Sequence, residues 1–217
     1  MATIPRRYVD NFTRTINGIS EDAQKRLANA LAKVTIDDIA TARNEIIAIM
    51  DALLSPYTDN VAAVAAVFYD GLRAQAGIDD GYEAEAESMR DPEATAGAVR
   101  AFMETQVKGQ PFDTLEKLLL ERADYEIKRA ANESVAYNAQ RDPKKPKWAR
   151  VPDGSETCNW CIMLASRGFV YGSKEMASHT HANCDCRIIP GFDNEPSVEG
   201  YDPDYYYDKW KSSEGSE

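Results

Sequence analysis

Cys158-Asn159-Trp160-Cys161 and, further along, His179-Thr180-His181-Ala182-Asn183-Cys184-Asp185-Cys186 contain all 4 cysteines and both histidines of this 217-residue chain. Two residues separate Cys158 from Cys161, and two residues also separate His181 from Cys184. This spacing gives two chelating pairs of the kind that four-coordinate structural zinc sites use. The sequence therefore predicts one structural zinc ion per chain, held in a small knuckle near the C-terminus.

Five residues are candidates for the four ligand positions. We assign Cys158, Cys161 and Cys184, and His181 and Cys186 compete for the fourth position. We favour His181, because His181 and Cys184 repeat the spacing of the first pair. In the alternative set, Cys184 and Cys186 form a tighter chelate, and His181 hydrogen-bonds a thiolate instead.

Other interpretations of the cysteines compete with zinc. Disulfides fit the even count, but the N-terminal residues 1–7 lack the apolar core and cleavage site of a secretory signal. A redox Cys-x-x-Cys pair is possible because Thr157 could cap a short helix from Cys158, yet such a pair expects a strand–helix–strand context. Buried cysteines without a role explain poorly why four gather beside both histidines. Zinc remains the preferred hypothesis.

Helical periodicity extends from residue 20 to about residue 140. Ser20 is expected to cap an early helix, Pro56 to break the chain, and Pro92 to precede another helix. The longest helix is predicted at Phe112–Ala139. The fold class is therefore mainly α, with a bundle of five or six helices before a small α+β zinc knuckle with short strands. One apolar stripe, spaced by three and four residues, contains Ile36, Ile39, Ala40, Ile46, Ile47, Met50, Leu53 and Leu54.

Composition changes at residues 141–147, where two prolines and four basic residues interrupt an acidic chain. We predict a solvated basic Pro/Lys linker there, after a helical bundle at 1–140. A zinc module at 148–192 and an acidic aromatic tail at 193–217 follow. The tail could dock on a partner through its rings, pack on its own bundle or stay disordered.

Two short strands are predicted to flank the ligands, at Trp148-Ala149-Arg150-Val151 and at Cys186-Arg187-Ile188-Ile189-Pro190. So small a module buries little surface by itself. A structural zinc ion supplies on the order of 10 kcal/mol of apparent binding energy coupled to folding. We therefore expect metal loss to melt the module while the helical bundle persists.

The formal net charge of -11 disfavours broad binding to nucleic acid or to an anionic membrane, because both need clustered Lys and Arg. No apolar run approaches membrane-spanning length. A protein partner or self-assembly is the better expectation.

The cysteine motif lies within a longer pattern. Its parts are Asp153-Gly154-Ser155-Glu156-Thr157-Cys158, then Ala165-Ser166-Arg167-Gly168-Phe169-Val170-Tyr171, and finally His181-Ala182-Asn183-Cys184-Asp185-Cys186. In order and spacing these parts resemble the signature of the Mu F-type minor head proteins of tailed bacteriophages. Further matching positions within residues 120 to 190 are Arg129, Asn132, Glu133, Trp148 and Pro190. The chain departs from the family pattern at Asp185, where a basic residue is usual, and at residues 178–180, where the approach to the histidine is usually proline-rich.

The resemblance implies a minor structural protein of the phage head, made in the bacterial cytoplasm and located in the virion. It implies a place at the portal vertex or in the capsid interior, a role in head morphogenesis and DNA delivery, and portal and capsid proteins as partners. A homo-oligomer is a further expectation, whereas no small-molecule substrate, membrane or catalytic activity is expected. The enzyme alternative is a zinc-stapled HNH-type nuclease with His179 or His181 as general base, but it needs a second metal and a basic face for DNA.

Overall fold

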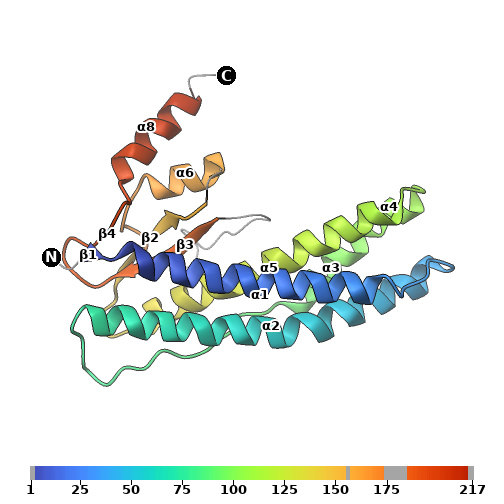
Figure 1. The fold of residues 1–217 in the computed structure, drawn as a ribbon, viewed down its shortest axis with the longest axis horizontal. Coiled ribbons are helices and arrows are strands. Elements are labelled where there is room, and N and C mark those ends of the chain that lie inside the picture. The colour runs from blue at the N-terminus through green and yellow to red at the C-terminus, as the bar shows by residue number, and fades with distance from the viewer. Residues whose placement is uncertain (1–2, 155–156, 174–184, 215–217) are drawn as a thin grey trace.

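The computed structural model describes residues 3–154, 157–173 and 185–214 of the chain. Three long helices lie side by side along the molecule (Figure 1): α1 (Arg6–Leu31), α2 (Ile39–Gln75) and α5 (Phe112–Arg141). The short helices α3 (Pro92–Phe102) and α4 (Glu104–Val107) pack against α5. The prediction of a mainly helical chain with a small strand region is confirmed. Within the part of the chain that the structure describes, no helix has the length and hydrophobicity of a membrane span.

Two predicted helix signals in the first half of the chain are wrong. Ser20 does not begin a helix but lies in the middle of α1. Its hydroxyl donates to Asp124 Oδ1 on α5 at 2.7 Å. Pro56 lies inside the continuous helix α2. Because Pro56 and Ala52 are both exposed, the carbonyl that loses its helical partner can be hydrated. Hydration offsets part of the roughly 3 kcal/mol that a proline costs inside a helix, and the packing of buried residues around it, such as Leu54 and Val61, offsets the rest.

The strand region begins directly after the long helix. Strand β2 (Lys147–Pro152) pairs antiparallel with β3 (Cys186–Gly191), so that Arg150 lies opposite Ile188 and Pro152 opposite Cys186. Both strands were predicted from their alternation and turn flanks. Helix α6 (Asn159–Ala165) lies between them in sequence and packs on β2.

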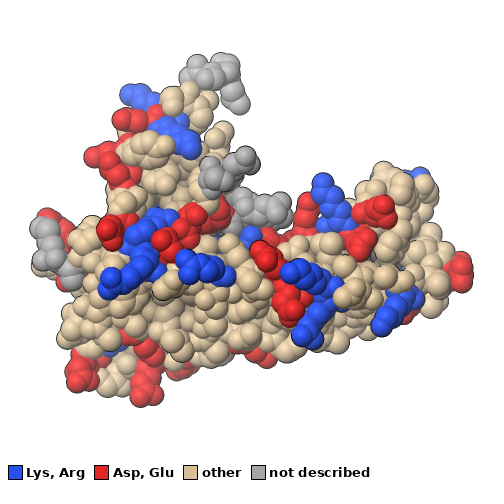
Figure 2. Space-filling view, viewed as in Figure 1, with Lys and Arg blue, Asp and Glu red and all other residues tan. Residues whose placement is uncertain are grey.

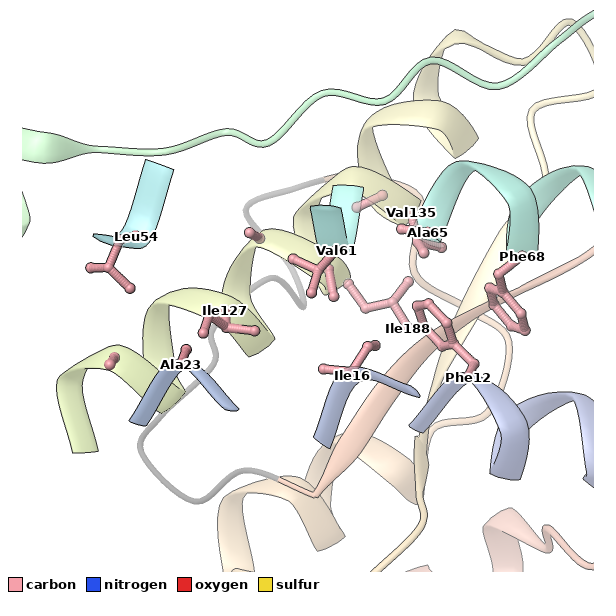
Figure 3. Packing of buried hydrophobic residues seen from close by; sticks show 14 of the residues in the cluster. Phe12, Ile16, Ala23, Leu54, Val61, Ala65, Phe68, Ile127, Val135 and Ile188 are labelled. Carbon is pink, nitrogen blue, oxygen red and sulfur yellow. The ribbon is translucent and has the colours of Figure 1, made fainter. Parts of the chain in front are cut away.

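One hydrophobic core runs through the helices and the strands. Figure 3 shows Ile188 of β3 among Phe12 and Ile16 of α1 and Val61 of α2. Ala149 and Val151 of β2 belong to the same buried cluster. The sheet formed by β2 and β3 therefore packs against the helical bundle, although the predicted linker at residues 141–147 separates the two in sequence.

That linker is a short connection. Lys144 and Lys145 are exposed, as expected for a solvated segment, but Asp142 is fully buried. The Asp142 carboxylate accepts hydrogen bonds from the Tyr69 hydroxyl at 2.9 Å and from the guanidinium of Arg73, itself buried on α2. A buried charge needs such partners, and here they fix the end of α5 against α2.

The two ends of the chain meet at the strand region. Strand β1 (Thr3–Ile4) pairs parallel with β4 (Ser197–Val198), and Tyr201 then buries its ring and donates to Ala165 O of α6. Helix α8 (Pro203–Glu214) packs on α6 and projects away from the bundle (Figure 1). Part of the acidic aromatic tail thus packs on the chain itself.

Candidate metal centre

The first Cys-x-x-Cys lies at the start of α6. Cys158 is the N-cap residue, and its Sγ accepts a hydrogen bond from the backbone N–H of Cys161 at 3.3 Å. Side-chain acceptors at N-caps satisfy N–H groups that have no partner within the helix. The sequence interpretation placed Thr157 at the cap, and the structure shifts the cap by one residue. The shift directs the Cys158 sulfur back over the first turn, toward Cys161.

Cys186 brings a third sulfur to the same place. It begins β3, and its Sγ lies 2.9 Å from Cys161 Sγ. Cys161 and Cys186 are both fully buried, whereas Cys158 is partly buried and packs against them. The fold therefore gathers three of the four cysteines from two separate elements.

A buried arginine contacts this sulfur cluster. The Arg150 side chain of β2 is fully buried, and its Nη2 and Nε lie 2.8 Å and 3.3 Å from Cys186 Sγ. A guanidinium is always charged, and its proximity favours the thiolate, which is the form of cysteine that binds metals. Sequence analysis missed this role. The available signal was a charged residue within the alternating strand Trp148-Ala149-Arg150-Val151.

Asp185 ties the turn before Cys158 to the start of β3. Its Oδ2 accepts from Thr157 Oγ1 at 2.8 Å and from the Gly154 N–H at 3.2 Å, and its backbone carbonyl accepts from Asp153 N. A Cβ on Gly154 would lie only 2.7 Å from Asp185 Cβ and Oδ2, so a glycine is needed there. The carboxylate that departs from the family pattern thus orders the turn that leads to the first ligand.

The same Asp185 carboxylate lies close to two of the sulfurs. Cys161, Asp185 and Cys186 offer ligand atoms that all lie within 4.8 Å of one another. Thiolates select soft metals such as zinc, and a carboxylate is a less frequent zinc ligand. Because Asp185 already accepts two hydrogen bonds, we interpret it as an orienting residue beside the sulfurs.

Helix α5 anchors the strand that carries Cys186. Asn132 is fully buried, its Nδ2 donates to Cys186 O at 3.3 Å, and its Oδ1 accepts from Ile188 N at 3.1 Å. Backbone groups of alternate residues in an antiparallel strand point to the same edge. The Asn132 amide therefore binds the free edge of β3 as a neighbouring strand would.

A charged network supports α5 one turn earlier. Arg129 donates to Glu126 at 2.9 Å and to Glu133 at 3.0 Å, and Thr95 of α3 donates to the same Glu126. Glu126 and Glu133 are buried, and Arg122 also pairs with Glu126. Arg129 and Glu133, which match the family pattern in sequence, thus contact each other. Asn132, which lies between them in sequence, contacts strand β3 instead.

The predicted ligands divide between described and undescribed parts of the chain. Cys158, Cys161 and Cys186 come together. Cys186 was not in the favoured ligand set, yet its Sγ lies 2.9 Å from Cys161 Sγ. His181 and Cys184 lie outside the described residues, as does His179. The choice of ligands stays a prediction.

Comparison with known proteins places this geometry in a family. The model of the VG15 protein family matches residues 3–213. The Gene 15 protein of Mycobacterium phage L5 is 30% identical over an aligned part that covers 31% of this chain and 37% of the relative. The Gene 15 protein of Mycobacterium phage D29 is 32% identical over 32% of this chain and 38% of the relative. The chain thus spans less than two fifths of the length of these curated relatives.

No solved structure matches the chain. The family model covers almost all of the chain, including every element around the sulfur cluster. The chain therefore belongs to the VG15 protein family and is a phage protein.

Proposed function

We propose that this phage protein is a minor structural component of the virion head, acting at the portal vertex or capsid interior in head morphogenesis and in DNA delivery. Its phage relatives and the resemblance of residues 120–190 to Mu F-type minor head proteins support this role. The observation that carries the proposal is that two parts of that signature contact each other in the fold. Asn132 of the long helix hydrogen-bonds the strand that starts at Cys186.

The charge distribution supports a protein partner over nucleic acid. Figure 2 shows basic and acidic side chains interspersed on one face of the molecule, without a broad basic field. Together with the net charge of -11, this pattern disfavours a DNA-binding surface that works by releasing counterions from phosphates. A structural role with portal and capsid proteins as partners is consistent with it.

We propose that the sulfur cluster holds a structural zinc ion. The donor set fits zinc, because three cysteine sulfurs converge from α6 and β3 and a buried guanidinium lies against the sulfur of Cys186. Cys158, Cys161 and Cys186 would be three of the ligands, with the fourth from His181 or Cys184. When bound, such an ion joins the turn before α6 to β3 and releases folding energy with binding.

Elemental analysis of purified protein and of single variants tests the zinc site. We expect about one zinc per chain, lost on Cys161→Ser and on Cys186→Ser, since a structural zinc site needs all its four ligands. His179→Ala is the matched control for His181→Ala, because only His181 shares the spacing of a chelating pair. Full zinc occupancy in Cys186→Ser would exclude Cys186 as a ligand. Metal-free wild-type protein with an intact strand region would overturn the zinc proposal.

Co-expression with the portal and capsid proteins encoded by the same phage genome tests the head role. We expect the protein to co-sediment with portal rings or capsid shells, and not with free DNA at physiological salt. The comparison variant is the same chain with Asn132→Ala, which removes the side-chain hydrogen bonds between α5 and β3. DNA binding without affinity for portal or capsid protein would contradict the proposal and favour the nuclease alternative.

A further inference from the structure

An open apolar groove lies between the first half of α1 and the last third of α2. Its volume is about 320 Å³, and the rings of Phe12 and Phe68 stack in its floor at a centroid distance of 4.1 Å. Val67 on its wall is 74% exposed, more than any other large hydrophobic residue among those described. An apolar side chain so exposed beside stacked rings is typical of a contact surface. The lining residues are Tyr8, Asn11, Phe12, Thr15, Val64, Val67, Phe68 and Gly71.

The rim of this groove on α1 is positively charged. Arg7 and Arg14 are exposed and lie on the helical stripe next to the lining residues, with Asn11 between them. Arg14 Nη1 donates to Asn11 Oδ1 at 3.3 Å, and the Arg7 guanidinium lies 5.7 Å from the centroid of the Tyr8 ring. Among the described residues neither guanidinium has a carboxylate partner. An occupant with apolar rings and acidic flanks would therefore complement the groove.

The start of α8 has that composition. Residues 202–208 contain three aspartates and no basic residue, and Tyr205 and Tyr207 are 58% and 47% exposed. Tyrosine combines a large apolar ring with a polar end, which suits partly hydrated interfaces. The surface of the chain thus carries both an apolar groove with a basic rim and an aromatic segment with acidic flanks.

The two surfaces of one chain do not meet. Helix α8 is held on α6 and projects away from α1 and α2 in Figure 1. We propose that the groove between α1 and α2 binds the α8 segment of a second copy of this chain. The contact is heterologous, so successive copies form a ring or an open chain. This inference goes beyond the proposed head function and does not depend on it.

The contact should be weak and sensitive to salt. A segment of two helical turns buries less than the roughly 1,200 Å² of a standard interface, so dissociation constants on the order of micromolar or weaker are expected. Arginine–aspartate pairs at an exposed rim are screened by salt. Self-association should therefore rise with protein concentration and fall as ionic strength increases.

Sedimentation velocity over a range of concentrations tests the inference. We expect concentration-dependent oligomers of the wild-type chain and a monomer for Val67→Asp. The matched control is Val107→Asp, because Val107 is also exposed (68%) but lies on α4, away from the groove. Circular dichroism and thermal melting establish that each variant is folded.

Charge reversal gives the sharper test. Arg7→Glu/Arg14→Glu leaves an acidic groove facing an acidic α8, and Asp204→Lys/Asp208→Lys leaves a basic α8 facing a basic groove. Each double variant should be monomeric alone, and an equimolar mixture should associate, because every contact between the two variants is then complementary. Wild-type protein that stays monomeric at all concentrations would overturn the inference. So would association that neither Val67→Asp nor the charge reversals weaken. Zinc content and portal binding are separate measurements, so their failure would not affect this result.

Discussion

Replacing Asn132 by alanine should destabilise the protein by about 2–4 kcal/mol. The amide makes hydrogen bonds to the carbonyl of Cys186 and the N–H of Ile188, and all three residues are fully buried. Each net hydrogen bond contributes about 1 kcal/mol, and a buried backbone group without a partner costs about 1–3 kcal/mol. β3 pairs with β2 through its other edge, so no backbone group of that strand can replace the lost amide.

Urea unfolding followed by circular dichroism measures the loss of stability directly. For a chain of this size, the melting temperature should fall by roughly 5–15 °C. Asn60→Ala is the control, since Asn60 is exposed on α2 and reports the small gain in helix propensity from asparagine to alanine, about 0.6 kcal/mol. Amide hydrogen exchange should show faster exchange at Ile188. A stability within 1 kcal/mol of the control, with Ile188 still protected, would refute the role assigned to Asn132.

Three further outcomes follow from the structure. Asp142→Asn should cost about 2 kcal/mol in urea unfolding, because it removes a buried charge-assisted hydrogen bond from the Arg73 guanidinium, which keeps its second pairing with Asp80; a cost below 1 kcal/mol would contradict this role of Asp142. Burial and the negative charges nearby raise the pKa of Tyr82 to about 12, so its contribution to stability is complete below pH 10 and is lost as the pH rises toward 12. In a spectrophotometric pH titration, the Tyr82→Phe variant should lack one of the tyrosines that ionise above pH 10 in the wild-type protein. Gly154→Ala should lower the melting temperature because its Cβ meets the Cβ and Oδ2 of Asp185, and Asp185→Gly, which removes both atoms, should relieve that clash; if Gly154→Ala costs as much in the Asp185→Gly background as in the wild-type chain, the clash is not the cause.

Local signals in the sequence predicted most of the secondary structure. The long helix α5 and the strands β2 and β3 were predicted almost to their observed ends, because proline, glycine and alternating apolar residues mark these boundaries. Pro56 was misread because the roughly 3 kcal/mol that a proline costs inside a helix is offset by the packing of buried residues around it, such as Leu54 and Val61. That packing involves other helices, which one local window of sequence does not contain.

The sulfur cluster was only partly predictable, for a different reason. Spacing alone gave Cys158, Cys161, His181, Cys184 and Cys186 as candidates and favoured His181 over Cys186, whereas the fold brings the sulfur of Cys186 against Cys161. The spacing could not indicate that Arg150 lies against Cys186 Sγ, because that contact depends on the register of β2 against β3. Nor could it indicate that Asn132, far away in sequence, completes the edge of β3.

The shared core changes what the zinc ion would contribute. A zinc knuckle that folds alone obtains most of its stability from the metal. Removing the metal then unfolds the knuckle and leaves neighbouring domains intact. Here Ile188 and Val151 are buried in the same cluster as Ile16 of α1 and Val61 of α2. The strands therefore already obtain hydrophobic stabilisation from the helices, on the order of 2 kcal/mol for each fully buried aliphatic side chain. In this arrangement the metal would mainly fix α6 and its turn on β3, so metal loss should loosen α6 and that turn while β2 and β3 stay packed on the helices.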